Sequence, residues 1–130
     1  MGPHKNLVVW QKSMDLVREI YQATAQYPKS ETYGLVSQMR RCVVSIPSNI
    51  AEGYGRGSNA DLIHFLYFAL GSLNELETQI IISKDLSYIG DAEATELETM
   101  NDEVMKMLNS LIYKRLHQDP DTDCPDNLKT

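Results

Sequence analysis

The sequence predicts an all-α protein, an antiparallel up-down-up-down bundle of four helices. Four segments repeat apolar residues every three or four positions, which is the spacing of one face of an α-helix. No segment shows the apolar and polar alternation that is typical of a half-buried strand. The connections between the four segments are short, so we expect successive helices to pack antiparallel.

The first helix is expected over residues 7–27, because Pro28 disfavours helical backbone at the residue before it. Its core-facing positions are predicted to be Leu7, Trp10, Met14, Val17 and Tyr21. The second helix is expected to be capped by Ser30 and to end at the glycine-rich segment 53–57. Its core positions are predicted to be Leu35, Met39, Val43, Ile46 and Ile50. Pro47 has no backbone N–H to donate, so we expect a kink or a local break over residues 43–47.

The third helix should begin at Ser58, with Asp61 three residues later in a capping-box-like arrangement. It has the longest apolar seam, formed by Leu62, Leu66, Ala69, Leu73, Leu76 and Ile80. A turn is expected over residues 87–90, after which Asp91 should cap a fourth helix that reaches about His117. Its core positions are predicted to be Leu97, Met100, Val104, Met107 and Leu111.

Length and composition favour one bundle domain over residues 1–117, followed by an acidic disordered tail over residues 118–130. No apolar run approaches the roughly 20 residues of a membrane-spanning helix, and no secretory signal precedes the bundle. We therefore expect a cytoplasmic protein without a membrane partner. Cys42 and Cys124 have no neighbours at metal-binding or redox spacing, so a disulfide is not expected.

Charge is distributed unevenly along the chain, whose net charge is −6. Residues 1–60 hold seven Lys or Arg and four Asp or Glu, whereas residues 61–130 hold five and fourteen. A polyanion would therefore have to bind the first half, because the second half repels it.

A polar stripe on the second helix is the first candidate binding surface. Its residues follow one another by three or four positions: Gln38, Arg41, Ser45, Asn49, Glu52 and Arg56. The stripe could be a solvated face on which Glu52 and Arg56 form an ordinary i,i+4 pair. Alternatively, it lines a subunit boundary or a groove, where Arg41 and Arg56 offer forked donors to carboxylate or phosphate.

Two glutamates beside the seam of the third helix, Glu75 and Glu77, are the second candidate contact. A charge near a seam often marks a register or oligomer contact. Arg40 points about 100° away from Arg41 on a helix, so the two arginines serve different surfaces. We expect a salt link from one of them to Glu75 or Glu77.

Enzymatic sites are disfavoured. The second helix is followed by a glycine-rich segment that could form a small anion nest or only end the helix, with glycines at Gly53, Gly55 and Gly57. This segment matches neither the dinucleotide fingerprint nor a Walker A loop. Helix bundles hold di-iron centres with Glu-x-x-His motifs, and the nearest approach here is Asp61-x-x-His64. No Ser or Cys has a motif that would pair it with a base. We therefore expect no metal, no cofactor and no catalytic residue.

The segment 37–53, Ser-Gln-Met-Arg-Arg-Cys-Val-Val-Ser-Ile-Pro-Ser-Asn-Ile-Ala-Glu-Gly, closely resembles the signature of a bacterial four-helix-bundle family. That family is encoded in intervening sequences of 23S ribosomal RNA genes and is sometimes called ribosomal. Further similarity lies in Gly55-Arg56, in residues 7–10, 27–35 and 71–79, and together these segments span most of residues 7–115.

The resemblance implies a homopentameric, ring-shaped barrel of four-helix protomers. It also implies kinship with the accessory variability determinant of diversity-generating retroelements, which binds nucleic acid and a reverse transcriptase. The signature positions are Arg40, Arg41, Asn49, Glu52, Gly53 and Arg56, and the second motif holds Glu75 and Glu77. That relative is basic, whereas this chain is acidic.

Three functions are considered as hypotheses. The first is a non-enzymatic oligomeric binding or scaffold protein that uses the polar stripe as its contact surface. The second is an accessory protein that binds RNA or DNA through Arg40, Arg41, Arg56 and nearby lysines such as Lys12. The third, an enzyme with a metal in the bundle core, is the least favoured.

Overall fold

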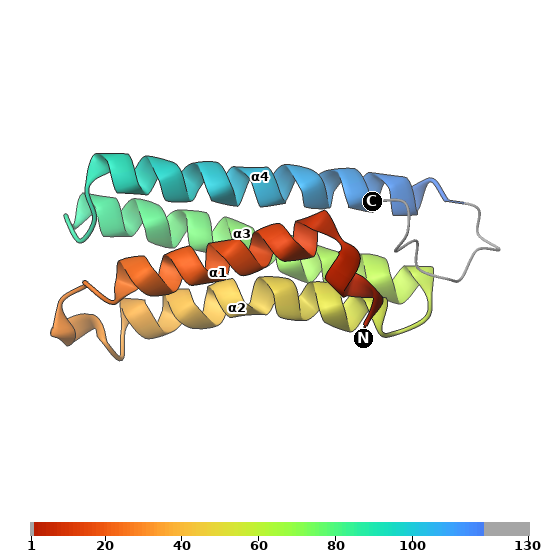
Figure 1. Ribbon diagram of the computed structural model, residues 1–130, viewed down its shortest axis with the longest axis horizontal. Helices are drawn as coiled ribbons and strands as arrows, with labels where there is room; N and C mark the ends of the chain where they lie inside the picture. Colours follow the sequence, from red (N-terminus) through yellow and green to blue (C-terminus); the bar gives the residue numbers. More distant parts are fainter. Residues whose placement is uncertain (1, 119–130) are drawn as a thin grey trace.

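Four long helices pack side by side around one core (Figure 1). This computed structural model describes residues 2–118. The helices are α1 (Val8–Thr24), α2 (Leu35–Tyr54), α3 (Asn59–Asp85) and α4 (Asp91–Leu116), with short 3-10 turns η1 (Pro3–Asn6) and η2 (Lys29–Glu31). Both α1 and α3 contact α2 and α4. No strand occurs within residues 2–118, so the all-helical prediction is confirmed. From residue 119 on, the expected acidic tail lies outside the described residues.

The core positions predicted for α2 and α3 are confirmed with one exception. Met39, Val43, Ile46 and Ile50 of α2 are fully buried, whereas Leu35 is only half-buried and Val36 beside it is buried. All six positions of the predicted α3 seam are also fully buried, since α3 packs between α2 and α4. No helix within residues 2–118 is long and apolar enough to cross a membrane.

The predicted core face of α1 is partly wrong. Leu7 is buried, but Trp10, Met14 and Val17 are only half-buried and Tyr21 is exposed. The buried face instead holds Val9, Ser13, Leu16, Ile20, Ala23 and Thr24.

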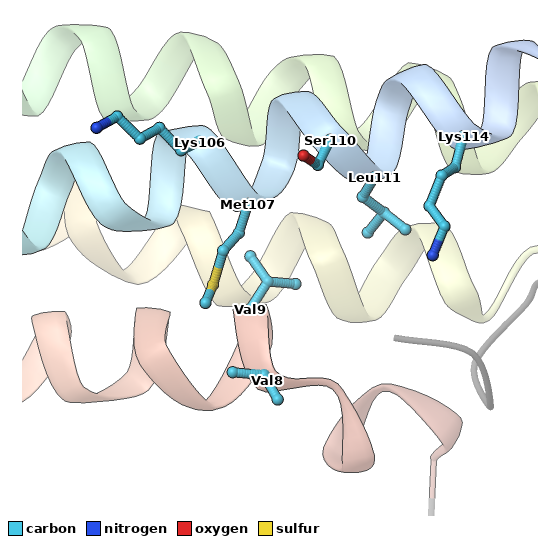
Figure 2. Close-up of a pocket in the computed structure, with 7 residues that line it drawn as sticks. All are labelled: Val8, Val9, Lys106, Met107, Ser110, Leu111 and Lys114. Carbon is cyan, nitrogen blue, oxygen red and sulfur yellow. The ribbon is translucent and has the colours of Figure 1, made fainter.

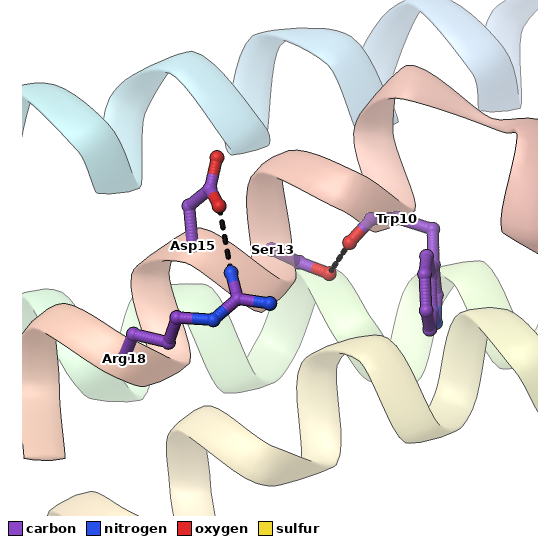
Figure 3. A network of polar contacts seen from close by, with 4 residues as sticks. All are labelled: Trp10, Ser13, Asp15 and Arg18. Carbon is purple, nitrogen blue, oxygen red and sulfur yellow. Dashed lines mark hydrogen bonds and ion pairs between the residues drawn. The ribbon is translucent and has the colours of Figure 1, made fainter.

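Two of these buried residues, Ser13 and Thr24, are polar, so the buried face of α1 does not appear as a continuous apolar pattern in the sequence. Ser13 donates a 2.7 Å hydrogen bond to the carbonyl oxygen of Trp10 (Figure 3), and Thr24 donates one of 2.7 Å to that of Ile20. Bonded in this way to their own helix, both hydroxyls can be buried. Asp15 and Arg18 form a 2.8 Å ion pair on the exposed side of α1 (Figure 3).

The core face of α4 also differs from the prediction. Leu97, Val104 and Leu111 are buried as expected, whereas Met100 and Met107 are half-buried. Their places are taken by Asn101 and Leu108, which are fully buried. The Asn101 amide donates a 3.1 Å hydrogen bond to the carbonyl oxygen of Leu73 in α3. A polar residue therefore sits in the α3–α4 interface, where periodicity alone did not place it.

Of the three predicted N-cap residues, only that of α3 is confirmed. The Ser58 hydroxyl accepts a 3.1 Å hydrogen bond from the backbone N–H of Asp61, which confirms the predicted cap of α3. The predicted Ser30 cap of α2 is wrong, because Lys29–Glu31 form η2 and Gly34 occupies the N-cap position. The predicted Asp91 cap is displaced by one residue, since Gly90 is the N-cap and Asp91 begins α4.

Pro47 does not interrupt α2, so the expected local break is wrong. The helix runs from Leu35 to Tyr54 with Pro47 buried inside it. Pro47 lines the same apolar surface as Trp10 and Met14 of α1. Burial of the ring against α1 therefore offsets the missing backbone hydrogen bond.

Candidate functional site

The polar stripe of α2 contacts α3 at its middle and at its C-terminal end, through Ser45 and Arg56. The Ser45 hydroxyl donates to the carbonyl oxygen of Cys42 at 2.6 Å and lies 2.6 Å from the hydroxyl of Ser72 in α3. The Cys42 thiol is directed at the carbonyl oxygen of Ser72, 3.0 Å away. Asn49 donates to the carbonyl oxygen of Ser45 at 2.8 Å. The middle of the stripe is therefore joined to α3 by short polar contacts.

The end of the stripe carries a charged pair over an aromatic ring. Arg56 Nε lies 3.0 Å from Glu52 Oε2, which confirms the predicted i,i+4 pair. The same guanidinium lies 5.0 Å from the centre of the Phe65 ring in α3. Both partners of the ion pair are about half exposed, so the pair itself contributes little stability. Its geometry nevertheless holds the guanidinium beside α3 rather than in open water.

Gly53 permits this close approach of α2 to α3. A Cβ at Gly53 would lie 3.0 Å from Leu62 Cδ1 and from Phe65 Cβ, and 3.3 Å from the Leu62 carbonyl oxygen. Tight packing against α3, rather than backbone conformation, therefore favours glycine at this position.

Arg40 does not belong to the stripe. Its Nε donates a 2.9 Å hydrogen bond to the Thr24 hydroxyl, and its Nη2 donates one of 3.2 Å to the Tyr21 carbonyl oxygen. Its guanidinium also lies 4.4 Å from the centre of the Tyr21 ring. Arg40 thus binds the last turn of α1, where a cation is favoured by the helix dipole.

Arg41 is exposed and lines a shallow surface between α1 and α2. Arg40, Ser37 and Tyr33, which is 95% exposed, line the same surface. Within residues 2–118, Arg41 makes no hydrogen bond or ion pair. Arg41 is therefore a cation that is available to a partner. The amide of Gln38, on the same stripe, is also exposed but carries no charge.

The two predicted glutamates face different directions, because residues two apart on a helix diverge by about 200°. Glu75 lies three residues from Ser72, on the side of α3 next to α2, and accepts a 3.1 Å hydrogen bond from Gln79. Glu77 is half-buried on another side of α3. Among the described residues, no ion pair joins either glutamate to Arg40 or Arg41, and Arg40 binds α1 instead.

Cys42 is a poor nucleophile at this contact. Burial, and secondarily the nearby Glu75 carboxylate, raises the pKa of its thiol to about 12. Because the thiolate is the reactive form, Cys42 acts here as a small apolar residue. No group of three His, Cys, Asp or Glu side chains within residues 2–118 is arranged to hold a metal ion.

An aromatic cluster on α3 was missed by the sequence reasoning. The His64 ring lies 4.4 Å from that of Phe68 and 5.8 Å from that of Phe65. Phe68 and its neighbour Tyr67 are about half exposed. Further along, the exposed apolar residues on and just after α3 are Ile81, Ile82 and Leu86.

A signal for this exposed apolar surface was present in the sequence. Residues 65–70 and 80–82 are uninterrupted apolar runs, and a helix can turn only part of such a run toward one core. The remaining apolar side chains must face outward. We call the surface formed by Ser45, Asn49, Glu52 and Arg56 with Phe65, Phe68, Ser72, Glu75 and Ile82 the α2–α3 face.

The chain is similar to known proteins over a region that includes the α2–α3 face. A family model described as 23S rRNA-intervening sequence protein matches residues 5–110. The chain is also similar to a crystal structure of a protein of unknown function from the S23 ribosomal protein family of Bacteroides thetaiotaomicron VPI-5482, with 28% identity and a TM-score of 0.75. That similarity covers 84% of this chain and 98% of the other. The chain matches no curated protein.

Proposed function

Because the chain belongs to the family of 23S rRNA-intervening sequence proteins, we propose that it is a non-enzymatic scaffold protein whose antiparallel up-down-up-down protomers assemble into a cytoplasmic ring, most simply a homopentamer. The α2–α3 face is the contact surface of this assembly. The observation that carries the proposal is the exposed apolar surface of α3 beside the polar stripe of α2.

Energetics favour burial of this surface. Phe68 is 50% exposed and Ile82 is 41% exposed, so covering both side chains removes apolar area from water in each protomer. Each such residue contributes on the order of 1 kcal/mol when the remaining half of its surface is buried. The neighbouring Glu52, Arg56 and Asn49 supply directional polar contacts, which select one partner orientation.

The experiment is a mass measurement in solution on wild type and on Phe68→Glu and Ile82→Glu. A charge in the centre of the contact should dissociate the ring into smaller species while the helix content stays unchanged. Tyr113→Glu is the matched control, because Tyr113 is 63% exposed on α4 and distant in sequence from this face. A monomeric wild type, or an unchanged mass in both face variants, would contradict the proposal.

Arg56→Ala tests the polar part of the α2–α3 face, and Arg41→Ala tests the part of the polar stripe that lies outside this face. We expect either variant to weaken assembly or partner binding without loss of helix content. Unchanged sedimentation together with unchanged partner binding in both variants would argue against a role for the stripe.

Nucleic-acid binding is the second candidate function. The observation that favours it is the guanidinium of Arg56 over Phe65, close to the exposed Phe68, since arginine and aromatic rings together stack on nucleobases. Arg41 would add a phosphate contact. Such binding must fall steeply with salt, so RNA and DNA are titrated at low and at moderate ionic strength. No binding at low ionic strength eliminates this candidate.

A further inference from the structure

The proposed ring limits which faces of neighbouring protomers can meet. Each protomer of a ring contacts its two neighbours through two different surfaces, which lie about 90–120° apart in a ring of about four to six protomers. Adjacent faces of a four-helix bundle are about 90° apart, and opposite faces are about 180° apart. Because α1 and α3 each contact α2 and α4, the faces adjacent to the α2–α3 face are the α1–α2 and α3–α4 faces. One of these two should therefore receive the α2–α3 face of the next protomer.

The α1–α4 side of the bundle is opposite to the α2–α3 face. It carries a groove of about 330 Å³, where Met107 and Leu111 of α4 extend toward Val8 and Val9 of α1 (Figure 2). Contacts through two opposite faces extend in a line and do not close into a small ring. The groove between α1 and α4 is therefore not the surface that receives the α2–α3 face.

Charge distinguishes the two adjacent faces. Helix α4 carries six Asp or Glu and three Lys or Arg, so the α3–α4 side repels the exposed carboxylate of Glu75 in a second copy. The α1–α2 side instead carries the guanidinium groups of Arg40 and Arg41. Neither guanidinium forms an ion pair within the part of the chain that the structure describes. Charge complementarity therefore favours the α1–α2 side.

The surface between α1 and α2 is hollowed in two places. The larger hollow, of about 520 Å³, is lined by Tyr21 of α1 and Arg41 of α2 among others. The smaller, of about 350 Å³, lies further along the same helices, between Trp10 and Pro47. Val44 lines both hollows and is 39% exposed, so they adjoin one another. We call the two hollows together the α1–α2 groove.

Three exposed residues of α3 form a row on the α2–α3 face. Phe68, Glu75 and Ile82 are seven residues apart, which is close to two helical turns, so they lie on the same side of the helix. The row places a carboxylate between two apolar side chains. The α1–α2 groove offers a guanidinium and apolar hollows, which is the complementary chemistry.

Cyclic symmetry adds a condition on height. A rotation moves nothing along its axis, so residues that meet across the boundary lie at the same level when the bundles stand along the ring axis. Two contacts between α2 and α3 mark the levels, namely Ser45 with Ser72 and Met39 with Ser83. Arg41 lies between the two α2 residues, and Glu75 lies between the two α3 residues. Arg41 and Glu75 are therefore at about the same level of the bundle.

The apolar ends of the row match the groove in the same way. Gly53 of α2 adjoins Phe65 of α3. Phe68 lies about one turn further along α3 and is therefore level with Ala51, which lines the smaller hollow. Ile82 is one residue from the second of the two marker contacts, at the level of the larger hollow.

We propose that α3 of one protomer lies in the α1–α2 groove of the next, with Glu75 paired to Arg41 across the boundary. This contact rests on the proposed ring assembly. In it Phe68 covers the smaller hollow and Ile82 the larger one. The ion pair fixes the register of the two protomers, while the apolar side chains supply the buried area. The salt link that the sequence suggested between helix-two arginines and Glu75 then forms between chains, and not within one.

Charge reversal tests the ion pair. Arg41→Glu places two carboxylates together and Glu75→Arg places two cations together, so each variant alone should raise the concentration at which the ring dissociates at least about tenfold. Combining both changes restores opposite charges and should return this concentration close to the wild-type value. Sedimentation over a dilution series measures the assembled fraction, and circular dichroism shows whether the helix content is retained.

Lys106→Glu and Glu96→Arg are the matched controls. Both residues are exposed on α4, outside the two proposed contact surfaces. These substitutions change the net charge by the same amounts as Arg41→Glu and Glu75→Arg. They should leave the assembled fraction unchanged.

Cross-linking tests the pairing of the two faces without relying on charge. Arg41→Cys combined with Glu75→Cys is treated with a short thiol cross-linker in a Cys124→Ser background, since Cys42 is buried and burial raises its thiol pKa to about 12. A ring whose contacts join two different faces should give a ladder of covalent multimers up to the full ring. A covalent dimer from Glu75→Cys alone would instead show that two copies of the same face meet.

The failures of the ring and of this contact are distinguishable. A monomeric wild type contradicts the ring and the contact together. An assembled wild type overturns only the contact if the single charge reversals leave assembly unchanged, if the double reversal does not recover it, or if no multimer beyond a dimer is cross-linked.

Discussion

The Tyr88 hydroxyl donates a 2.7 Å hydrogen bond to the Glu31 carboxylate and so joins the connection after α3 to the connection after α1. The other carboxylate oxygen accepts a 3.2 Å hydrogen bond from the backbone N–H of Leu35, the first residue of α2. Glu31 therefore takes over the capping role that the sequence suggested for Ser30. One side chain both caps α2 and holds two connections together.

Stability should depend on pH through Glu31. The Tyr88 hydroxyl, and secondarily the Leu35 N–H, holds the pKa of Glu31 below its ordinary value of 4.5. A lowered folded-state pKa contributes stability above the unfolded-state pKa, and that contribution is lost as the pH falls through the folded value. Glu31→Gln should therefore be less stable than wild type at neutral pH, with a difference that shrinks below the ordinary pKa.

Urea unfolding of both proteins between neutral pH and about pH 3 measures this difference. Tyr88→Phe is the control, because it removes the main donor and should weaken the pH dependence without abolishing it. A wild-type minus Glu31→Gln difference that stays constant over that range would contradict the assignment.

Two glycines should respond oppositely to alanine. At Gly53 a new Cβ meets Leu62 and Phe65 at 3.0 Å, so Gly53→Ala should destabilise the protein by about 1–3 kcal/mol. At Gly71, inside α3, nothing lies within 4 Å of a new Cβ, so Gly71→Ala should stabilise it by about 0.5–1 kcal/mol. Thermal or urea unfolding of the two variants tests the pair, and the same sign for both would be inconsistent with the packing described.

Substitutions of the adjacent residues Arg40 and Arg41 should differ in their effect on the free energy of unfolding. Arg40→Ala loses two hydrogen bonds and the contact with the Tyr21 ring, so unfolding should become easier by about 1–2 kcal/mol. Arg41→Ala should change the unfolding free energy by less than about 0.5 kcal/mol, as is usual for an exposed residue. Denaturant titrations measure both values. An Arg41→Ala variant as unstable as Arg40→Ala would show that Arg41 has an unrecognised role within the protomer.

Cys42 should resist thiol reagents in the folded protein. Its pKa of about 12 leaves almost no thiolate at pH 8. Mass spectrometry after a short alkylation at pH 8 should therefore find Cys42 unmodified, and unfolding in denaturant should make it reactive. Equal modification of Cys42 in the folded and unfolded protein would mean that the α2–α3 contact opens readily.

Parts of the site were predictable because they depend on local geometry. The Glu52–Arg56 pair and the Ser58 cap involve residues three or four positions apart, and helical spacing brings such residues together whatever the rest of the chain does. Arg40 and Arg41 were expected to serve different surfaces, but both line the surface between α1 and α2. The partner of Arg40 was not predictable, since it is Thr24, sixteen positions away.

The sequence by itself determined four helices, the buried seams of α2 and α3 and the membership of the polar stripe, because helix formation and spacing depend on near neighbours. The tertiary structure decided which side of α1 faces the core, how Pro47 is kept inside α2, and where Glu75 and Glu77 point. These features depend on packing between segments, which can bury Ser13 and Asn101 once their polar groups are bonded and leave Tyr21 and Phe68 outside. A helix with apolar residues on several sides has more surface than one core can cover, and only the neighbouring helices determine which part stays exposed.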